Sequence, residues 1–437
     1  MRTEDFRKPT QGPAFMTLLL AMFLYAVSLI KFFVRDPLSL RTGLQGPIEI
    51  GLVILAALVL AVVFRQRYWN FLWTPSAVAF MAFGAMATLS SVYSYYPLLS
   101  FLKGLSFLLV CGIAVVASSA FGPKNVITSL YRSLMIILAI GLIAKVAGGG
   151  PLLSIDDYSG RARFTLFAWH PGTLADLCAL TLLTGLLLPK RPPLYCQIFL
   201  FAINVATASR ASSALLVIIL VSIRLATVRL SPRFLFLCCC FGSVLTLAML
   251  VMIQKQGQPA EMITIGQSLH GDKLAEDLIT FSGRKEVWSA AEPLVSHSLF
   301  LGYGLDGSRD VLINNTTWGA GNAHNSLLDL ILAAGFPAML VFFAGWATAV
   351  KSAWQWRMFT RIGVLEAYTY IAAFGIFSPN LTYLQGLSSF LILTMDAMVF
   401  AEISQCEARG RRYFPMIEHY MPRQVAESWK RMPRRSL

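Results

Sequence analysis

The feature that most constrains this chain is a series of long apolar stretches that follow one another along almost its whole length. Crossing the hydrocarbon core of a bilayer, about 30 Å thick, takes about 20 apolar residues of α-helix. About twelve stretches approach that length: residues 14–33, 48–64, 75–92, 101–121, 126–147, 171–188, 194–208, 212–228, 234–253, 326–350, 364–377 and 384–400. Only 13% of the residues are charged, half the share in soluble domains. The sequence therefore predicts an all-α polytopic membrane protein with about twelve transmembrane helices.

The basic residues predict how these helices are oriented. A net charge of +14 would suggest nucleic-acid binding in a soluble protein, but here Lys and Arg sit in short links between apolar stretches, as the positive-inside rule describes. Residues expected in the cytoplasm are Arg65, Arg67, Lys124, Lys190, Arg191, Arg229, Arg233, Lys351, Arg357 and Arg361, whereas Arg35 and Arg41 go against the rule. The first stretch shows no small-residue cleavage pattern, so we expect a retained helix rather than a signal peptide. Both termini are then predicted to be cytoplasmic.

This topology divides the chain into four parts. Membrane helices one to nine occupy residues 1–253, and a large periplasmic loop follows at 254–324, between spans nine and ten. Helices ten to twelve occupy 325–401, and a basic cytoplasmic tail at 402–437 would be held by anionic lipid headgroups. Chemistry in the loop would have to work without cytosolic nucleotides.

His324 is the candidate catalytic residue on the outer side. It stands where a polar turn passes into an apolar stretch, so its imidazole should lie at the outer mouth of span ten. A histidine can accept a proton near neutral pH. In the alternative interpretation, Asn325 and Ser326 cap the helix and His324 is a bystander.

Several arginines are predicted on the same outer side, where the positive-inside rule should deplete them. Arg284 and Trp288 share a face of a short helix in the loop, at i and i+4. Arg210 lies between spans seven and eight, where it could simply snorkel to the interface or could hold phosphate oxygens with its guanidinium fork. Arg161 and Arg163 precede span six. Their common placement predicts an anionic partner.

Other polar residues have structural interpretations. Asp176, Asp329 and Asp396 lie within apolar stretches and should face the bundle interior, because a carboxylate is costly in lipid. Asp329 is five residues beyond His324, off the ideal i+4 face, so the two are not predicted to form a dyad. Pro337 predicts a bend or break in span ten.

No cofactor or metal is expected from the sequence. Residues 302–307 fit the dinucleotide-binding pattern but follow no strand of a βαβ unit, so we interpret them as a turn. The adjacent Asp156 and Asp157 have no third ligand at metal-binding spacing. The seven cysteines imply no disulfide framework, since none lies in the long polar loop.

The ordered motifs of the chain resemble those of the O-antigen ligase and polysaccharide polymerase family of bacterial envelope proteins. The segments that carry the resemblance are 163–167, His170-Pro171-Gly172, Thr207-Ala208-Ser209-Arg210, Gly283-Arg284 with Trp288, Leu301-Gly302-Tyr303-Gly304, His324-Asn325, and Gly335-Phe336-Pro337-Ala338. The family has a glycine where this chain has Ala338, a departure that leaves His324 in place. The resemblance covers residues 163 to about 350.

The resemblance implies transfer of a glycan from a polyprenyl-pyrophosphate carrier to a sugar hydroxyl, at the outer face of the bacterial inner membrane and without nucleotide or metal. Arg210 and Arg284, with Arg163 and Arg161, would bind the pyrophosphate, and His324 would take the acceptor proton. Asn325, Gly335 and Trp288 support the motif. The implied partners are the lipid-linked oligosaccharide, the glycan acceptor, membrane lipid, and a flippase and chain-length regulator.

Three alternatives stay open on the sequence alone. Polymerisation of exopolysaccharide or O-antigen repeat units is favoured over ligation of a finished glycan to lipid A core or protein. A secondary transporter would also have about twelve spans, but it should show two matching halves with a link between spans six and seven. A scaffold for other synthesis enzymes would not need arginines on the outer side.

Overall fold

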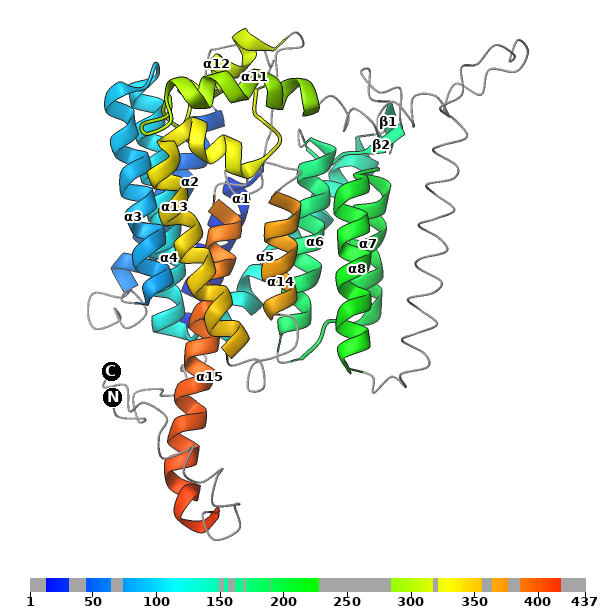
Figure 1. Ribbon diagram of the computed structural model, residues 1–437. Helices are drawn as coiled ribbons and strands as arrows, with labels where there is room; N and C mark the ends of the chain where they lie inside the picture. The colour runs from blue at the N-terminus through cyan, green and yellow to red at the C-terminus, as the bar shows by residue number, and fades with distance from the viewer. Residues whose placement is uncertain are drawn as a thin grey trace, which may run out of the picture.

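The computed structural model is a bundle of α-helices (Figure 1). It describes residues 13–30, 45–63, 74–148, 153–155, 162–167, 170–188, 190–227, 284–316, 321–355, 364–375 and 386–417. The helices are α1 (Pro13–Ser28), α2 (Gln45–Val63), α3 (Pro75–Leu89), η2 (Ser90–Tyr93), α4 (Pro97–Phe121), α5 (Pro123–Ala147), α6 (Pro171–Leu187), α7 (Leu194–Ala206), α8 (Arg210–Thr227), α11 (Arg284–His297), α12 (Gly307–Asn315), α13 (Ser326–Gln355), α14 (Val364–Gly375) and α15 (Leu387–Ile417). Strands β1 (Leu153–Ile155) and β2 (Ala162–Phe164) form an antiparallel pair.

Every apolar stretch that falls within the described residues contains a helix, and the stretch at 234–253 lies outside them. Four helices are long and apolar enough to cross a membrane: Pro75–Tyr93, Pro97–Phe121, Pro123–Ala147 and Ser326–Trp354. Five more apolar helices in the described part are shorter. The chain is thus a mostly helical membrane protein, while the number of twelve spans and the periplasmic placement of the loop stay predictions.

Local sequence sets where the helices begin and end. Pro75, Pro97 and Pro123 each stand in the first turn of a helix, where the amide hydrogen that proline lacks would have no partner. Gly122, with φ of 83°, ends α4 and leads directly into α5. The last helix continues beyond its apolar stretch to Ile417, and its lower part projects past the other helices (Figure 1).

Close packing holds the helices together, because lipid tails are as apolar as the side chains and give little hydrophobic drive. Phe342 of α13 lies edge-on against Phe80 and Phe83 of α3, with ring centroids 5.0 and 5.1 Å apart. A Cβ at Gly104 of α4 would lie 2.6 Å from the Cα of Thr88, so α3 and α4 approach as closely as glycine allows.

Helices α11 and α12 lie across one end of the bundle, which we call the capped end (Figure 1). A small apolar cluster joins them to α13, and its buried members are Val287, Ala291, Leu312, Ala323 and Leu332. The segment predicted as one polar loop therefore contains two helices that pack on the bundle.

Helix α13 is broken near its first third, as Pro337 predicted. Gly335 has φ of 84° and ψ of 166°, outside the helical region. The freed backbone groups are satisfied by residues 298–304, which we call the strap: Phe336 N–H donates to Leu299 O at 2.7 Å, and Tyr303 N–H donates to Leu332 O at 2.7 Å. Since an unpaired backbone group costs several kcal/mol in an apolar medium, the strap is needed wherever the break lies at membrane depth.

The break and the strap both require glycine. A Cβ at Gly335 would overlap the carbonyl oxygen of Phe300, and one at Gly302, where φ is 71°, would lie 2.8 Å from Gly335 N. Tyr93 adds a further tie, because its hydroxyl donates to Leu301 O at 2.6 Å. Residues 302–307, which fit a dinucleotide pattern, are thus a turn, as predicted.

We predict that Gly335→Ala lowers the thermal midpoint of the detergent-purified protein by several degrees. A backbone at φ 84° and ψ 166° lies in a region essentially restricted to glycine, so a residue with a Cβ there costs about 1–3 kcal/mol, and the overlap with Phe300 adds to that. The measurement is a fluorescence melting curve. The control is Gly51→Ala in α2, where a Cβ meets no atom within 4 Å and the midpoint should hold or rise. Equal midpoints for both variants would contradict the account of the strap.

Candidate functional site

His324 lies in the turn that leads into α13. The side chain of Asn325 accepts hydrogen bonds from Leu327 N at 2.9 Å and Leu328 N at 3.3 Å, so this residue caps the helix as one interpretation predicted. His324 itself has φ of 49°, and its N–H donates to Asn322 Oδ1 at 3.0 Å. A left-handed backbone is uncommon outside glycine, although histidine is among the residues that adopt it. The turn therefore fixes the direction in which the imidazole leaves the chain.

The residue before His324 is held from two sides. The indole Nε1–H of Trp288 in α11 donates to Ala323 O at 2.9 Å, and Ala323 N–H donates to Asp329 Oδ1 at 2.8 Å. Ala323 is fully buried. Asp329 thus acts on the backbone of the turn. Asp176 and Asp396 are buried in the bundle, as expected of carboxylates within apolar stretches.

Electrostatics separate His324 from an ordinary surface histidine. Its pKa is lowered to about 4, first by burial and then by the charges of Arg284 and His170. Burial also lowers the pKa of Arg284. The imidazole is therefore neutral at any pH well above 4 and can accept a proton. Arg284 and Trp288, predicted on one helix face, both reach this turn.

His170 is the site residue that sequence reasoning missed. It caps α6, and its Nδ1 accepts from Gly172 N at 3.2 Å, which leaves the proton of the neutral ring on Nε2. It was named only within the motif His170-Pro171-Gly172 and was not predicted as a site residue. The sequence did contain a signal for this residue. His170 directly precedes Pro171 and Gly172 at a predicted helix start, on the same outer side as His324.

Arg210 begins α8 at the capped end, and its side chain lies outside the described residues. The turn before it is firmly built. Ser209 N–H donates to the hydroxyl of Thr207 at 3.3 Å, and Ala208 has φ of 55°. Asn204 closes the turn from α7, since its Oδ1 accepts from Ser213 Oγ at 2.8 Å.

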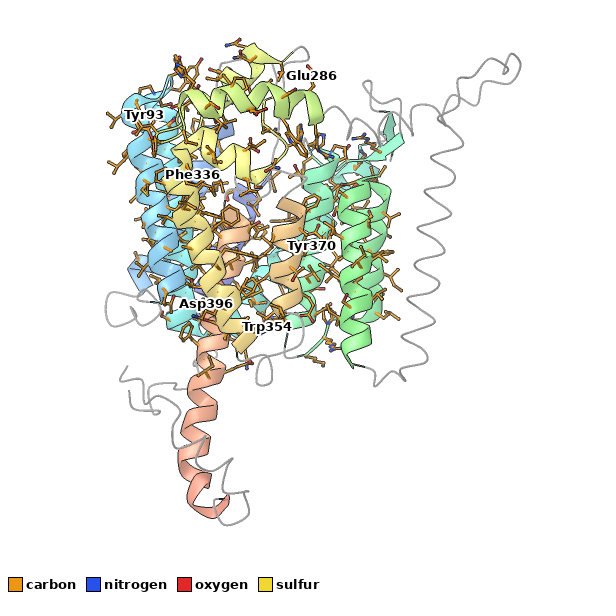
Figure 2. All side chains as sticks on the ribbon, viewed as in Figure 1. Tyr93, Glu286, Phe336, Trp354, Tyr370 and Asp396 are labelled. Atoms are coloured by element: carbon orange, nitrogen blue, oxygen red, sulfur yellow. The ribbon has the colours of Figure 1, made fainter. Side chains whose placement is uncertain are left out.

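A buried polar seam supports this turn from below. Asn204 Nδ2 donates to Ala175 O of α6 at 2.7 Å and to Ser212 Oγ of α8 at 2.9 Å. Ser212 Oγ in turn lies 2.8 Å from the hydroxyl of Tyr370 in α14, which Figure 2 shows inside the bundle. Helices α6, α7 and α14 therefore position the start of α8.

Arg163 belongs to the β-hairpin side of the capped end. Arg163 is partly buried in β2, paired with Ser154 of β1. The segment after β2 is tied to α5, because Lys145 Nζ donates to Thr165 O at 2.7 Å. Arg161 lies outside the described residues. Trp288 contacts the His324 turn, Arg284 and His170 lie close enough to lower the pKa of His324, and Arg163 lies on the hairpin at the capped end (Figure 1).

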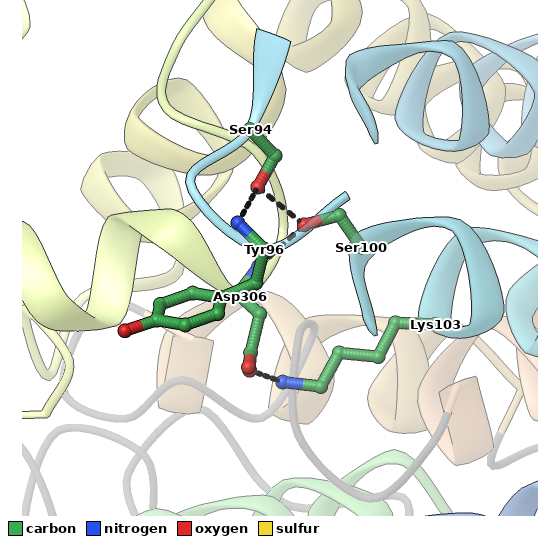
Figure 3. A network of polar contacts seen from close by, with 5 residues as sticks. All are labelled: Ser94, Tyr96, Ser100, Lys103 and Asp306. Atoms are coloured by element: carbon green, nitrogen blue, oxygen red, sulfur yellow. Dashed lines mark hydrogen bonds and ion pairs between the residues drawn. The ribbon is translucent and has the colours of Figure 1, made fainter. Parts of the chain in front are cut away.

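A polar network fixes the chain beyond the strap to the link between η2 and α4 (Figure 3). Ser94 Oγ accepts from Tyr96 N at 3.2 Å and lies 2.7 Å from Ser100 Oγ, which accepts from Asp306 N at 3.2 Å. Lys103 forms an ion pair with Asp306. The start of α12 is thus anchored to α4. In the part of the chain that the structure describes, no three His, Cys, Asp or Glu side chains gather as a metal site.

The family model described as O-antigen ligase matches residues 196–343. This match supports an O-antigen ligase-like family for the chain. The matched segment contains Arg210, Arg284, Trp288, His324 and Gly335, so it spans the turn before α8, the strap and the His324 turn. The resemblance inferred from the motifs is confirmed. No curated protein matches the chain. The match supports glycan transfer of the ligase or polymerase type by a membrane glycosyltransferase-like protein.

We predict that Arg284→Gln raises the pKa of His324. In the wild type a nearby positive charge disfavours the imidazolium, so removing that charge moves the pKa from about 4 toward the ordinary value of about 6.5. The measurement is histidine NMR on isotope-labelled protein, whose five histidines are assigned by single substitutions. Arg191→Gln, an exposed charge in the link between α6 and α7, is the matched control and should leave the pKa unchanged. An unmoved pKa in Arg284→Gln would place the guanidinium too far away to act.

Proposed function

We propose that this protein transfers a glycan from a polyprenyl-pyrophosphate carrier to a sugar hydroxyl at the outer face of the bacterial inner membrane. The observation that carries the proposal is the His324 turn, which Trp288 and Asp329 hold and on which the charge of Arg284 acts, within the segment that matches the O-antigen ligase family. A neutral imidazole is a proton acceptor, and a guanidinium fork suits phosphate oxygens. In this proposal the capped end faces outward.

The reaction is a single displacement. The acceptor hydroxyl oxygen attacks the anomeric carbon while the bond from that carbon to the pyrophosphate oxygen breaks, and His324 takes the hydroxyl proton. Arg284 and Arg210, with Arg163 and Arg161, stabilise the negative charge that grows on the departing pyrophosphate. Attack opposite the leaving group inverts the anomeric configuration, so a retained configuration in the product would overturn this step.

The low pKa of His324 fits a base that is activated by its substrate. In the free protein Arg284 and burial keep the imidazole neutral. The ring therefore stays unprotonated and able to act as a base. A bound pyrophosphate brings negative charge next to the ring and offsets Arg284, so the pKa of His324 rises and the ring becomes a stronger base. The base would then be strongest when the donor is in place.

Within this reaction class we favour polymerisation of exopolysaccharide or O-antigen repeat units, in which the acceptor is another lipid-linked glycan. The description of the matching family favours ligation as the second candidate, with lipid A core or a protein as acceptor. The two reactions need the same base and the same cations, and they differ only in the acceptor. A flippase that supplies the carrier and a chain-length regulator would be partners of the polymerase.

We predict that His324→Ala, in a deletion strain of the host, fails to restore polysaccharide and accumulates single lipid-linked repeats, because the acceptor hydroxyl loses its base. The measurement is glycan sizing and attachment, with protein levels verified by immunoblot. The matched control is His297→Ala, an exposed histidine of α11, which should restore long polymer. Full-length but unattached glycan would identify a ligase instead. Undiminished attached polymer would remove His324 from the mechanism.

A further inference from the structure

A second arginine contacts the His324 turn from the opposite helix of the cap. Arg309 lies in α12, and its guanidinium packs on Gly321, three residues before His324. A Cβ at Gly321 would lie 3.1 Å from Cζ, 3.2 Å from Nη1 and 3.3 Å from Nη2 of Arg309. Cζ, Nη1 and Nη2 are thus nearly equally far from the Cβ position at Gly321, so the flat face of the guanidinium lies against the turn. Trp288 contacts the same turn from α11, and the charge of Arg284, at the start of that helix, acts on His324.

The charge of Arg309 is not neutralised within the described residues. Lys103 pairs with Asp306 and Lys124 with Glu402, and no ion pair of Arg309 is found among the described residues. Arg309 Nε is buried and has no hydrogen-bond partner among the described residues. Asp306, one turn earlier, is already paired with Lys103, and the neighbouring Asp310 forms no ion pair within this part of the chain. A partly buried guanidinium with unused donors is costly unless something anionic meets it.

The position of Arg309 strengthens the case for an anion. It is the third residue of α12, where the helix dipole also favours negative charge. Asp306, which would otherwise neutralise this helix end, is drawn to Lys103 of α4. The anchor that fixes α12 therefore also leaves Arg309 as the unpaired charge beside the turn.

We propose that Arg309 binds an oxyanion of the glycan substrate, a phosphate or a sugar carboxylate, at a second position beside His324. The inference rests on the proposed function and deepens it, because it adds a binding residue that the family motifs do not contain. Two sources offer this chemistry: the pyrophosphate of the carrier and an acidic sugar in the glycan. A substrate held by Arg284 on one side of the turn and by Arg309 on the other would be fixed relative to His324 at two points.

The test measures the binding of two probes, inorganic pyrophosphate and glucuronate, to the purified full-length protein by calorimetry. The variants are Arg309→Gln, which removes the charge, and Arg309→Lys, which keeps it without the fork. We expect Arg309→Gln to bind one of the probes about tenfold more weakly, the scale of one charge-assisted hydrogen bond, and Arg309→Lys to lose less. Arg191→Gln should bind both probes as the wild type does.

The probe that weakens identifies the source. Weaker pyrophosphate binding supports the proposal with the carrier as the ligand, and weaker glucuronate binding alone supports it with an acidic sugar. Wild-type protein that binds neither probe, or Arg309→Gln protein that binds both as tightly as the wild type, would overturn it. If Arg309→Gln lowers the melting midpoint while the affinities for both probes stay at the wild-type values, Arg309 has a purely structural role in packing on Gly321. That result also overturns the proposal.

The failure of this inference is separable from failure of the proposed function. If His324→Ala still makes attached polymer, the proposed chemistry fails whatever Arg309 binds. If His324→Ala abolishes polymer and Arg309→Gln leaves both probe affinities unchanged, the proposed function holds and the second anion position does not.

Discussion

The break in α13 is the constraint on which the rest of the structure depends. A helix interrupted at Gly335 exposes backbone donors and acceptors that an apolar environment cannot satisfy, so the break exists only with the strap in place. The strap joins α11 to α12 and continues to the anchor at Lys103. The need to pair the backbone groups freed at Gly335 therefore fixes α11 and α12, the two helices that contact the His324 turn.

The site inherits its electrostatics from this arrangement. His324 leaves a turn that Trp288 and Asp329 hold through the backbone of Ala323, so its imidazole has little freedom to move away from Arg284. Burial and nearby positive charge both lower the pKa of His324 and keep the ring neutral. In the proposed mechanism, the negative charge of a bound substrate offsets the positive charge of Arg284, so the pKa rises again. In that mechanism this base is tuned by its own ligand.

The sequence predicted the parts of this fold that depend on local chemistry. Apolar stretches gave the helices, and Pro337 gave the break, because hydrophobic length and a missing amide hydrogen act at short range. The strap could not be predicted, since Gly302 and Gly335 matter only where distant backbones meet. For the same reason the sequence marked Arg284 and His324 as candidates but not the approach of His170 or Arg309, which depends on how α6 and α12 sit at the capped end. The prediction ended the last helix at residue 400, where the apolar stretch ends, but α15 continues to Ile417. Polar residues with good helix propensity can extend a helix beyond its apolar part.

The site is assembled from the ends of elements rather than from their middles. His170 starts α6, Arg210 starts α8, Arg284 starts α11, and His324 directly precedes α13. These four starts gather at one end of the bundle, where helix dipoles add positive potential to that of the arginines. An amphipathic donor with an anionic head and a lipid tail matches such a place, because its charge meets the capped end while its tail stays among the helices and the lipid. The geometry thus favours chemistry on a lipid-linked anion at the membrane boundary over passage of a solute through the bundle.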